Sequence, residues 1–430
     1  MNRRTLTALA AAAALTLTLT ACSGGDDAPT TSEAQQATGP ITIWYSNNEQ
    51  EVAWGEKMVA AWNSANPDQQ VTAQEIPAGA SSEEVIGAAI TAGTAPCLIF
   101  NTAPAAVGQF QRMGGLVNLS TFPDGASYIE QRSGEVAQQY QADDGGYYQL
   151  PWKSNPVMIF YNKKLFDRAG LDPENPQLST YDDFLTAARA IKSSKAAPYA
   201  IYPAPTSEFF QTLFDFYPLY AAATNGKGLV EDGQATFAGQ EGIDVATFWK
   251  TIYAEGLAGK ETYQGDSFAD GQAAMAIVGP WAVAVYQDQV EWGSVPVPTP
   301  TGAPAAETWT FSDAKNVGLY TACQNQGTAW EVLKFATSTE QDGALLSTTG
   351  QMPLRTDLQT TYADYFAANP AYELFGDQAA RVVEVPSGPR TVEMLQTLRD
   401  AYTRSVIFGQ GDVAAELQTA ADKVTELAGD

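Results

Sequence analysis

The sequence predicts an α/β protein of two lobes, each a mainly parallel sheet flanked by helices. Two observations carry this prediction. In residues 41–100, short apolar runs alternate with stretches of helical periodicity, the pattern of a mostly parallel sheet covered on both faces. About 390 of the 430 residues lie beyond an N-terminal leader and tether. That length exceeds what one hydrophobic core accommodates, so a second domain is expected.

Residues 1–21 have the order of a secretory signal peptide. Arg3 and Arg4 form a basic start, residues 6–19 are apolar, and Leu19-Thr20-Ala21-Cys22 closes the segment. The apolar stretch is shorter than the about 20 residues that a spanning helix needs. Its ending resembles the box of bacterial lipoproteins, which implies that Cys22 carries a lipid; a signal peptide without lipid is the alternative. Residues 22–39 are expected to form a flexible tether.

The composition excludes several classes of function. The 23 basic and 49 acidic residues give a net charge of −26, and loss of Arg3 and Arg4 with the leader makes it −28 (21 − 49). Such a charge disfavours nucleic acid or a bare anionic surface as the partner. The chain has no histidine and three cysteines. Histidine-dependent catalysis and cysteine- or histidine-based metal sites are therefore excluded, and no cofactor is expected.

Residues 41–100 supply the first candidates for a ligand site. Strands are expected at residues 41–45, 71–76 and 97–100, and helices at 51–64 and after the capping box that runs from Ser81 to Glu84. Ligands of such sheets bind beyond the carboxyl ends of the strands. The polar residues at those ends are Asn48 and Glu49 after the first strand and Asn101 after the third.

Residues 147–163 hold a polar interruption between two β-type runs. Trp152 to Asn155 stand there, and Pro156 keeps Asn155 out of the helical region. Without further context, these residues predict a loop with a tryptophan in the core. However, Leu-Pro-Trp-Lys-Ser-Asn-Pro, followed by Phe-Tyr-Asn-Lys-Lys-Leu-Phe, resembles the extracellular sugar-binding proteins of ABC transporters, of the maltose-binding type. In that family the stretch crosses between two lobes, which implies that Trp152 and Asn155 face the ligand.

A second match to this family is more specific. Residues 266–281 resemble its signature F-x-x-G-x-A-A-M-x-x-x-G-P-W, with a buried strand expected at residues 274–278 and a sharp exit at Gly279-Pro280. The exit places Trp281 at the carboxyl end of the strand, where its ring suits the apolar face of a sugar. A tryptophan of the core is the alternative.

Other residues are assigned through the same resemblance. Glu208 and Phe210 match an acid and an aromatic residue of the family's cleft, and residues 309–313, with Trp309 and Asp313, match a loop that faces it. Arg355 ends a G-x-x-P-x-R turn and either binds ligand hydroxyls or pairs with a surface acid. The family commonly has an acid at the positions of Cys97 and Asn155, so the particular sugar is left open.

The resemblance runs from about residue 41 to the C-terminus and implies the two-lobed periplasmic-binding-protein fold with a ligand cleft between the lobes. Lobe 1 is expected to comprise residues 40–153 and 320–376, and lobe 2 residues 154–319 and 377–430. Cys97 begins a strand of lobe 1, and Cys323 ends the strand that returns to it. In an exported protein a disulfide between them is plausible.

Together these features predict a binding protein and not an enzyme. The resemblance implies a monomeric lipoprotein on the extracellular face of the cell membrane, which captures a sugar, in particular an oligosaccharide, by hinge closure and delivers it to an ABC permease. Two alternatives are open. One is a secreted glycosidase that uses paired carboxylates, and the other is a polyol-phosphate-binding relative that uses Lys153 and Arg355.

Overall fold

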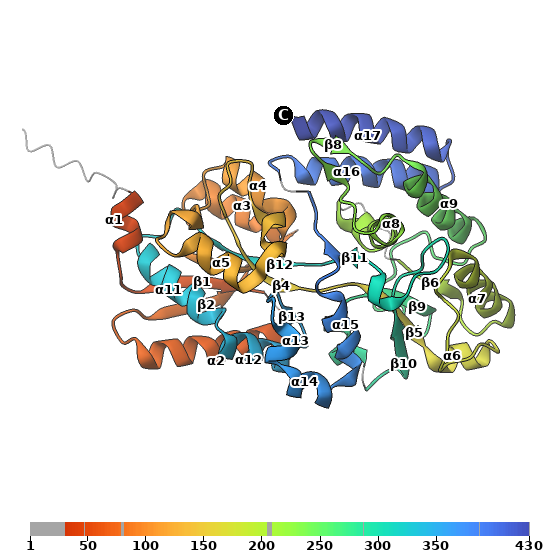
Figure 1. Ribbon diagram of the computed structural model, residues 1–430, viewed down its shortest axis with the longest axis horizontal. Coiled ribbons are helices and arrows are strands. Elements are labelled where there is room, and N and C mark those ends of the chain that lie inside the picture. Colours follow the sequence, from red (N-terminus) through yellow and green to blue (C-terminus); the bar gives the residue numbers. More distant parts are fainter. Residues whose placement is uncertain are drawn as a thin grey trace, which may run out of the picture.

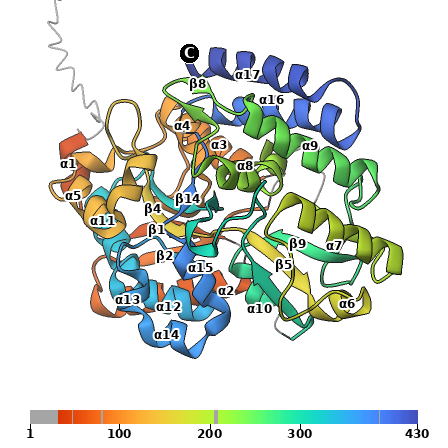
Figure 2. The same ribbon diagram turned by 45° about the vertical axis from the view of Figure 1, so that its right-hand side comes forward.

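The computed structural model describes residues 31–46, 48–78, 81–203, 209–286, 288–386 and 388–429. Two sheets flanked by helices form two lobes, and extended segments of the chain pass between them (Figure 1). The view turned by 45° shows the C-terminal helices packed over the second lobe, with the N-terminal end of one of them beside the first (Figure 2). The two-lobed α/β fold predicted from the sequence is therefore confirmed.

The first lobe is built on a sheet that, in the described residues, has six strands in the order β13-β4-β12-β3-β1-β2. The strands are β1 (Ile41–Tyr45), β2 (Val71–Glu75), β3 (Leu98–Thr102), β4 (Leu150–Ser154), β12 (Lys315–Leu319) and β13 (Met352–Pro353). Its helices are α1 (Thr31–Gln36), α2 (Glu49–Ala65), α3 (Ser82–Ala92), α4 (Pro104–Arg112), α5 (Gly125–Ser133), α11 (Gln326–Ala336) and α12 (Thr339–Thr349). The Ser81 side chain accepts from Glu84 N at 3.1 Å and so begins α3 as predicted.

The second lobe has a sheet whose described strands follow the order β10-β5-β9-β6. They are β5 (Met158–Asn162), β6 (Tyr199–Ile201), β9 (Ala273–Val278) and β10 (Trp292–Val295). The larger helices are α6 (Lys163–Arg168), α7 (Tyr181–Ser194), α8 (Phe216–Thr224), α9 (Gln240–Ala254), α10 (Trp281–Tyr286), α16 (Thr391–Tyr402) and α17 (Val413–Gly429). Short elements complete it: β7 (Val230–Glu231), β8 (Gln234–Ala235), β11 (Thr310–Phe311), β14 (Val382–Val383) and the 3-10 helix η3 (Phe209–Leu213).

The strand directions differ from the expected mainly parallel sheets. β1 runs parallel to β2 and β3, but β12 is antiparallel to both β3 and β4, and β5 is antiparallel to both β9 and β10. The physical reason is the repeated crossing between lobes. A strand that leaves a lobe and a strand that returns beside it run in opposite directions, so each sheet is mixed.

The lobe boundaries also differ from the expected ones. β12 lies in the range expected for lobe 2 but pairs within the first sheet. The helices α13 (Leu358–Thr361), α14 (Ala363–Ala368) and α15 (Glu373–Gln378) lie in the range expected for lobe 1, yet they join a cluster with Phe160 of β5 and Tyr286 of α10. The ring of Phe375 lies 5.9 Å from that of Phe160. The same cluster includes Leu346 of α12 and Met352 of β13, so apolar packing ties these helices to both lobes, a contact that periodicity cannot reveal.

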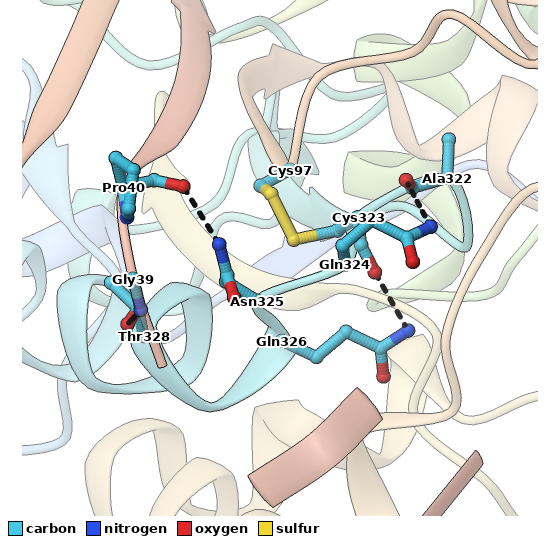
Figure 3. The surroundings of a disulfide bond; sticks show 9 residues. All are labelled: Gly39, Pro40, Cys97, Ala322, Cys323, Gln324, Asn325, Gln326 and Thr328. Carbon is cyan, nitrogen blue, oxygen red and sulfur yellow. Dashed lines mark hydrogen bonds between the residues drawn. A yellow bond between two sulfur atoms is a disulfide. The ribbon is translucent and has the colours of Figure 1, made fainter. Parts of the chain in front are cut away.

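A disulfide fastens one end of the first sheet. Cys97 precedes β3, Cys323 follows β12, and their sulfur atoms are bonded with the Cα atoms 4.5 Å apart (Figure 3). Beside the bridge, Asn325 Nδ2 donates to Pro40 O at 2.9 Å. The two cysteines are 226 residues apart in sequence, yet both belong to the first lobe. The bridge therefore secures that lobe without tying it to the second.

Candidate ligand-binding site between the lobes

The lobes are joined by neighbouring chain segments that run in opposite directions. Residues 155–157 lead from β4 to β5, and residues 312–314 lead back from β11 to β12. Val157 N donates to Phe311 O, and Asp313 N donates to Asn155 O, each at 3.0 Å. A third segment, β14, pairs in parallel with β11. These backbone bonds hold the polar side chains of the crossing segments together at the junction.

A buried ion pair lies beside this junction. Glu51, in the first turn of α2, accepts hydrogen bonds from the Lys153 ammonium of β4, from Gln351 Nε2 at 2.7 Å and from Ser46 Oγ at 2.6 Å. Lys153 has no exposed surface, and Glu51 is 4% exposed. Lys153 Nζ also lies 4.5 Å from the centroid of the Trp152 ring. The pair therefore connects the end of β1, the start of α2, β4 and the residue before β13.

Burial and the partner's charge act in opposite directions on the pKa of each member of this pair. Burial would raise the pKa of Glu51, but the charge and hydrogen bond of Lys153, with the bonds from Ser46 and Gln351, hold it below its ordinary value. Burial lowers the pKa of Lys153, and the neighbouring Glu51 charge opposes that shift. Removal of either side chain would leave the other charge buried without compensation, which is costly.

A pocket of about 240 Å³ opens between the lobes next to the crossing segments. Its apolar wall consists of rings from the second lobe, and its polar groups come from both lobes and from the crossing. The aromatic rings are Phe209, Phe210, Phe214 and Phe311, and the polar residues are Glu83, Ser312, Asp313, Lys315 and Glu384. Flat rings beside hydrogen-bonding groups suit a ligand that has an apolar face and a polar rim.

The charges of the pocket perturb one another. Lys315 Nζ is 2.5 Å from Asp313 Oδ1. Burial would lower the pKa of Lys315, but the Asp313 charge and hydrogen bond, with the more distant Glu83, raise it above its ordinary value. Burial raises the pKa of Glu384 to about 8, and the Asp313 charge adds to this, while Tyr140 and Lys315 partly offset it. The pocket thus holds one acid that is largely protonated near neutral pH.

Two of the residues predicted from the sequence line this pocket, and a third, Asn155, contacts one of them without lining it. Phe210 lies in η3, lines the pocket and is 42% exposed, although most large apolar side chains of the lobe are buried. Asp313 lines the same pocket. Asn155 is buried at the crossing, and its Nδ2 donates to Asp313 O at 3.2 Å and to Gln351 Oε1 at 3.3 Å. Its Oδ1 has no hydrogen-bond partner among the described residues.

Two more predicted residues lie near the pocket without lining it. Trp281 is half-buried at the start of α10, and its ring is 6.4 Å from that of Phe214. A side chain at Gly279 would come within 2.0 Å of the Trp281 ring, which explains the glycine of the signature. Asn101 has a left-handed φ of 69° in β3, next to the pocket-lining residues 103–105. Direct roles for Trp281 and Asn101 in binding stay predictions.

Asn48 and Glu49 have other surroundings. Asn48 caps α2, and its side-chain oxygen accepts from Gln50 N at 3.1 Å and from Glu51 N at 3.0 Å. Glu49 is exposed in the first turn of the same helix, where its charge favours the helix dipole. Neither residue lines the interlobe pocket. The cap nevertheless fixes the turn that carries the buried Glu51.

Three further predicted residues have surroundings outside the interlobe pocket. Trp152 has no exposed surface and packs on Trp54 and Phe100 in the core of the first lobe, so it has no face to offer a ligand. Arg355 is bound to Asp342 and Asp357, the alternative in which it pairs with acids. Trp309 covers the turn at Gly226 and lines a separate pocket, which shares Glu384 and Val385 with the interlobe one. Glu208 and Cys22 lie outside the described residues.

Sequence reasoning missed several polar residues of the site. Glu51 resembles an ordinary acid of a surface helix, and no local pattern marks it as buried. Lys315 stands two residues after Asp313, a spacing that is common on any surface. Glu384 had a usable signal, because it interrupts the apolar run Val382-Val383-Glu384-Val385. An acidic residue inside a run of β-branched residues is expected to be buried. Because burial of an acid is costly, its presence there indicates a functional role.

The lobes also touch at a place away from the crossing segments. Gly108 in α4 lies against Gly388, which precedes α16, and a side-chain carbon at Gly108 would come within 2.1 Å of Gly388 O. One turn along α4, Arg112 donates from its guanidinium to Pro389 O at 3.1 Å. Both ribbon views place α4 beside α16 (Figures 1 and 2). A backbone approach this close requires glycine at position 108.

Two α/β lobes, joined by adjacent crossing segments and separated by an aromatic and acidic pocket, define a two-lobed solute-binding protein. The chain belongs to the family of bacterial extracellular solute-binding proteins, whose family profile matches residues 46–343. Among the residues described, no helix has both the length and the apolar composition needed to cross a bilayer.

Several proteins with related sequences are named for the carbohydrates that they bind. The chain is 23% identical over 368 residues to a maltotriose-binding protein of Pyrococcus abyssi, covering 84% of this chain and 76% of that one. It is 26% identical over 237 residues to a maltooligosaccharide ABC transporter solute-binding lipoprotein of Streptococcus pneumoniae, 52% of each chain.

Solved structures support the fold. The cyclic alpha-maltosyl-1,6-maltose binding protein of Arthrobacter globiformis superposes with a TM-score of 0.77 at 20% identity, over 91% of this chain and 99% of that one. The sugar-binding protein MalE of Xanthomonas citri gives a TM-score of 0.71 at 22% identity, over 91% and 97%. At these identities the likeness establishes the shared fold.

The buried ion pair predicts a large effect of one substitution. Lys153→Met leaves the Glu51 charge buried without its partner, and we expect a loss of about 3–5 kcal/mol in the free energy of unfolding. Lys164→Met is the matched control, because Lys164 pairs with Glu291 at 3.7 Å while both side chains are mostly exposed; its effect should stay within about 0.5 kcal/mol. Urea denaturation measures both, and equal stability of the two variants would contradict a structural role for the pair.

Proposed function

We propose that this protein is the sugar-binding component of an ABC importer. It captures a carbohydrate, in particular an oligosaccharide, in the pocket between its lobes, closes over it and delivers it to a membrane permease. The observation that carries the proposal is the combination, in one interlobe pocket, of an exposed ring (Phe210) with acids at the chain crossing (Asp313 and Glu384).

The chemistry of sugars fits this combination. A sugar ring has an apolar C–H face, which packs on an aromatic ring, and a rim of hydroxyls, which donate to carboxylate and amide oxygens. Phe210 offers the ring, and Asp313 offers a carboxylate as the acceptor. The names of the related proteins from Pyrococcus abyssi and Streptococcus pneumoniae, which bind maltotriose and maltooligosaccharides, support the same class of ligand.

Closure of the lobes accounts for how a ligand in this pocket is retained. Hinge closure is an established way for two-domain binding proteins to enclose a ligand. The crossing segments supply the hinge, and the contact of Gly108 with Gly388 supplies a second meeting point of the two lobes. A closed protein with a bound sugar presents the permease with a shape that the open protein lacks.

The alternatives receive less support. The family and the compared structures are binding proteins, which disfavours a glycosidase. A polyol-phosphate ligand would need free cations, but Lys153 is paired with Glu51, and Arg355 with Asp342 and Asp357. The interlobe pocket itself is acidic. A neutral or positively charged sugar fits it better than an anion does.

The test of this function is a thermal-shift screen over mono- and oligosaccharides. A sugar present at 100 times its Kd adds about 2.7 kcal/mol to the stability of the folded state, so the melting temperature should rise with a ligand and stay unchanged with the others. Phe210→Ala should weaken binding of the selected sugar by about 2 kcal/mol, roughly thirtyfold in Kd, because it removes the exposed ring.

Phe408→Ala is the control for this variant, since Phe408 is also exposed, at 53%, but does not line the pocket. It should bind the selected sugar as the unchanged protein does. Equal affinity of the Phe210 and Phe408 variants for the sugar would contradict the assignment of this pocket as the binding site. A screen in which no sugar shifts the melting temperature would contradict the proposed function itself.

We also propose that Cys22 carries a lipid and anchors the protein, as a monomer, to the extracellular face of the membrane. The order of the leader, ending in Leu19-Thr20-Ala21-Cys22, motivates this, and the name of the related Streptococcus pneumoniae protein includes a lipoprotein assignment. When the full chain is expressed in a bacterial host, the unchanged protein should fractionate with membranes, and Cys22→Ser should lose that association. Equal membrane association of both would contradict lipidation.

A further inference from the structure

Two ion pairs lie next to each other where β4 and β12 form a ladder. Lys315, the first residue of β12, stands opposite Lys153 of β4. Each lysine has its own acid: Lys153 is bound to Glu51, and Lys315 is bound to Asp313. Like charges directly opposite one another on neighbouring strands are unfavourable, and apolar residues often replace ion pairs without loss of stability. Two matched lysines at this place therefore require an explanation beyond packing.

The two pairs differ in their exposure. The side chains of Lys153 and Glu51, the inner pair, are 0% and 5% exposed, whereas those of Lys315 and Asp313, the outer pair, are 24% and 26% exposed. Both members of the outer pair line the interlobe pocket, and neither member of the inner pair does. The inner pair thus fastens the crossing, while the outer pair presents charged groups to the pocket.

The outer pair has bonding capacity left. An ammonium group has three N–H donors, and a carboxylate has two acceptor oxygens. In the described part of the chain, the ammonium of Lys315 donates to Oδ1 of Asp313, and neither side chain makes a further hydrogen bond. Two N–H groups of Lys315 and Oδ2 of Asp313 are therefore available to a ligand. The pair offers a donor and an acceptor side by side.

This donor and acceptor are held in place. Asp313 N donates to Asn155 O at 3.0 Å, and Asn155 Nδ2 donates to Asp313 O at 3.2 Å, so the backbone of Asp313 is bound on both sides. Burial would lower the pKa of Lys315, but the Asp313 charge and hydrogen bond, with the Glu83 charge, raise it above its ordinary value. The ammonium therefore stays charged at neutral pH, and the polar group is preorganised for binding.

Adjacent hydroxyls of a sugar match this arrangement. Each hydroxyl can donate one hydrogen bond and accept another. One hydroxyl oxygen can accept from Lys315 while the next hydroxyl donates to Asp313, and both bonds are of the stronger, charge-assisted kind. Because the two charges of the outer pair cancel, the pair favours no net charge on the ligand. A phosphate or carboxylate would have to compete with Asp313 for Lys315.

We propose that Lys315 and Asp313 together recognise two adjacent hydroxyls of an uncharged sugar unit, the first accepting from Lys315 and the second donating to Asp313. This inference rests on the sugar-binding function proposed above. It adds Lys315 to the binding residues and names the group of the sugar that the pocket selects. The exposed ring of Phe210, in the same pocket, covers the apolar face of that unit.

Calorimetric titration of variants tests the inference. The probe is the tightest binder among glucose, galactose, mannose, xylose, maltose, cellobiose, lactose, trehalose and maltotriose. Lys315→Met and Asp313→Asn should each weaken its binding about tenfold or more, because each removes a charge-assisted bond. Lys334→Met is the matched control, since Lys334 pairs with Asp124 at 2.9 Å, has a side chain that is 23% exposed and does not line the pocket. Its Kd should equal that of the unchanged protein.

Monodeoxy analogues of the same probe supply a readout that needs no variant. In the unchanged protein, removal of either of two neighbouring hydroxyls should weaken binding about tenfold. In Lys315→Met, the analogue that lacks the first of these hydroxyls should bind as tightly as the parent sugar. In Asp313→Asn, the same should hold for the analogue that lacks the second. Such a match between one side chain and one hydroxyl does not arise from a change in stability alone.

The outcomes separate the two proposals. Unchanged affinity of Lys315→Met or Asp313→Asn would overturn the inference and leave the sugar-binding function intact. Sensitive hydroxyls on carbons that are not adjacent, or no sensitive hydroxyl, would do the same. Tighter binding of glucose 6-phosphate or glucosamine than of all nine uncharged sugars would also overturn it. If none of these sugars binds, the proposed function itself is contradicted.

Discussion

The structure depends on one buried ion pair, Glu51 with Lys153, at the place where the chain passes between the lobes. The pair and its hydrogen bonds from Ser46 and Gln351 join the end of β1, the start of α2, β4 and the approach to β13. Lys153 has no exposed surface. A buried pair adds little net stability but strongly penalises any arrangement that separates it. It therefore fixes the first lobe's side of the hinge and the position from which the crossing segment leaves.

The other stabilising contacts of the structure lie either within a lobe or between the two lobes. The disulfide of Cys97 with Cys323 closes the first sheet, and the cluster around Phe160 and Phe375 attaches the late helices to the second. Between the lobes are the backbone bonds of the crossing segments, the contact at Gly108, and that same cluster where it includes Leu346 of α12 and Met352 of β13. A hinged binding protein needs rigid lobes with few links between them. The free energy of ligand binding can then drive one motion, the rotation of one lobe relative to the other.

The sequence predicted much of the fold because its signals are local. Alternating strands and helices, the capping box at Ser81 and the signature ending at Trp281 are all legible without tertiary contacts. The site is less predictable, since it depends on which face of a segment points inward. Trp152 and Phe210 are both predicted ligand residues, as aromatic residues beside polar ones, yet the first is buried on Trp54 and Phe100 and the second is exposed in the pocket. Only the register of β4 and the turn of η3 distinguish them.

Closure around the crossing segments is most directly tested by small-angle X-ray scattering of two glycine variants. A side-chain carbon at Gly108 would collide with Gly388 O across the lobes, whereas one at Gly87, within α3, would lie 3.8 Å from the ring of Phe110. Both substitutions to alanine favour the helix itself by up to about 1 kcal/mol. With a saturating sugar, the unchanged protein and Gly87→Ala should contract to the same radius of gyration, and Gly108→Ala should remain extended. Contraction of Gly108→Ala to the same radius, or no contraction of the unchanged protein, would contradict closure at this contact.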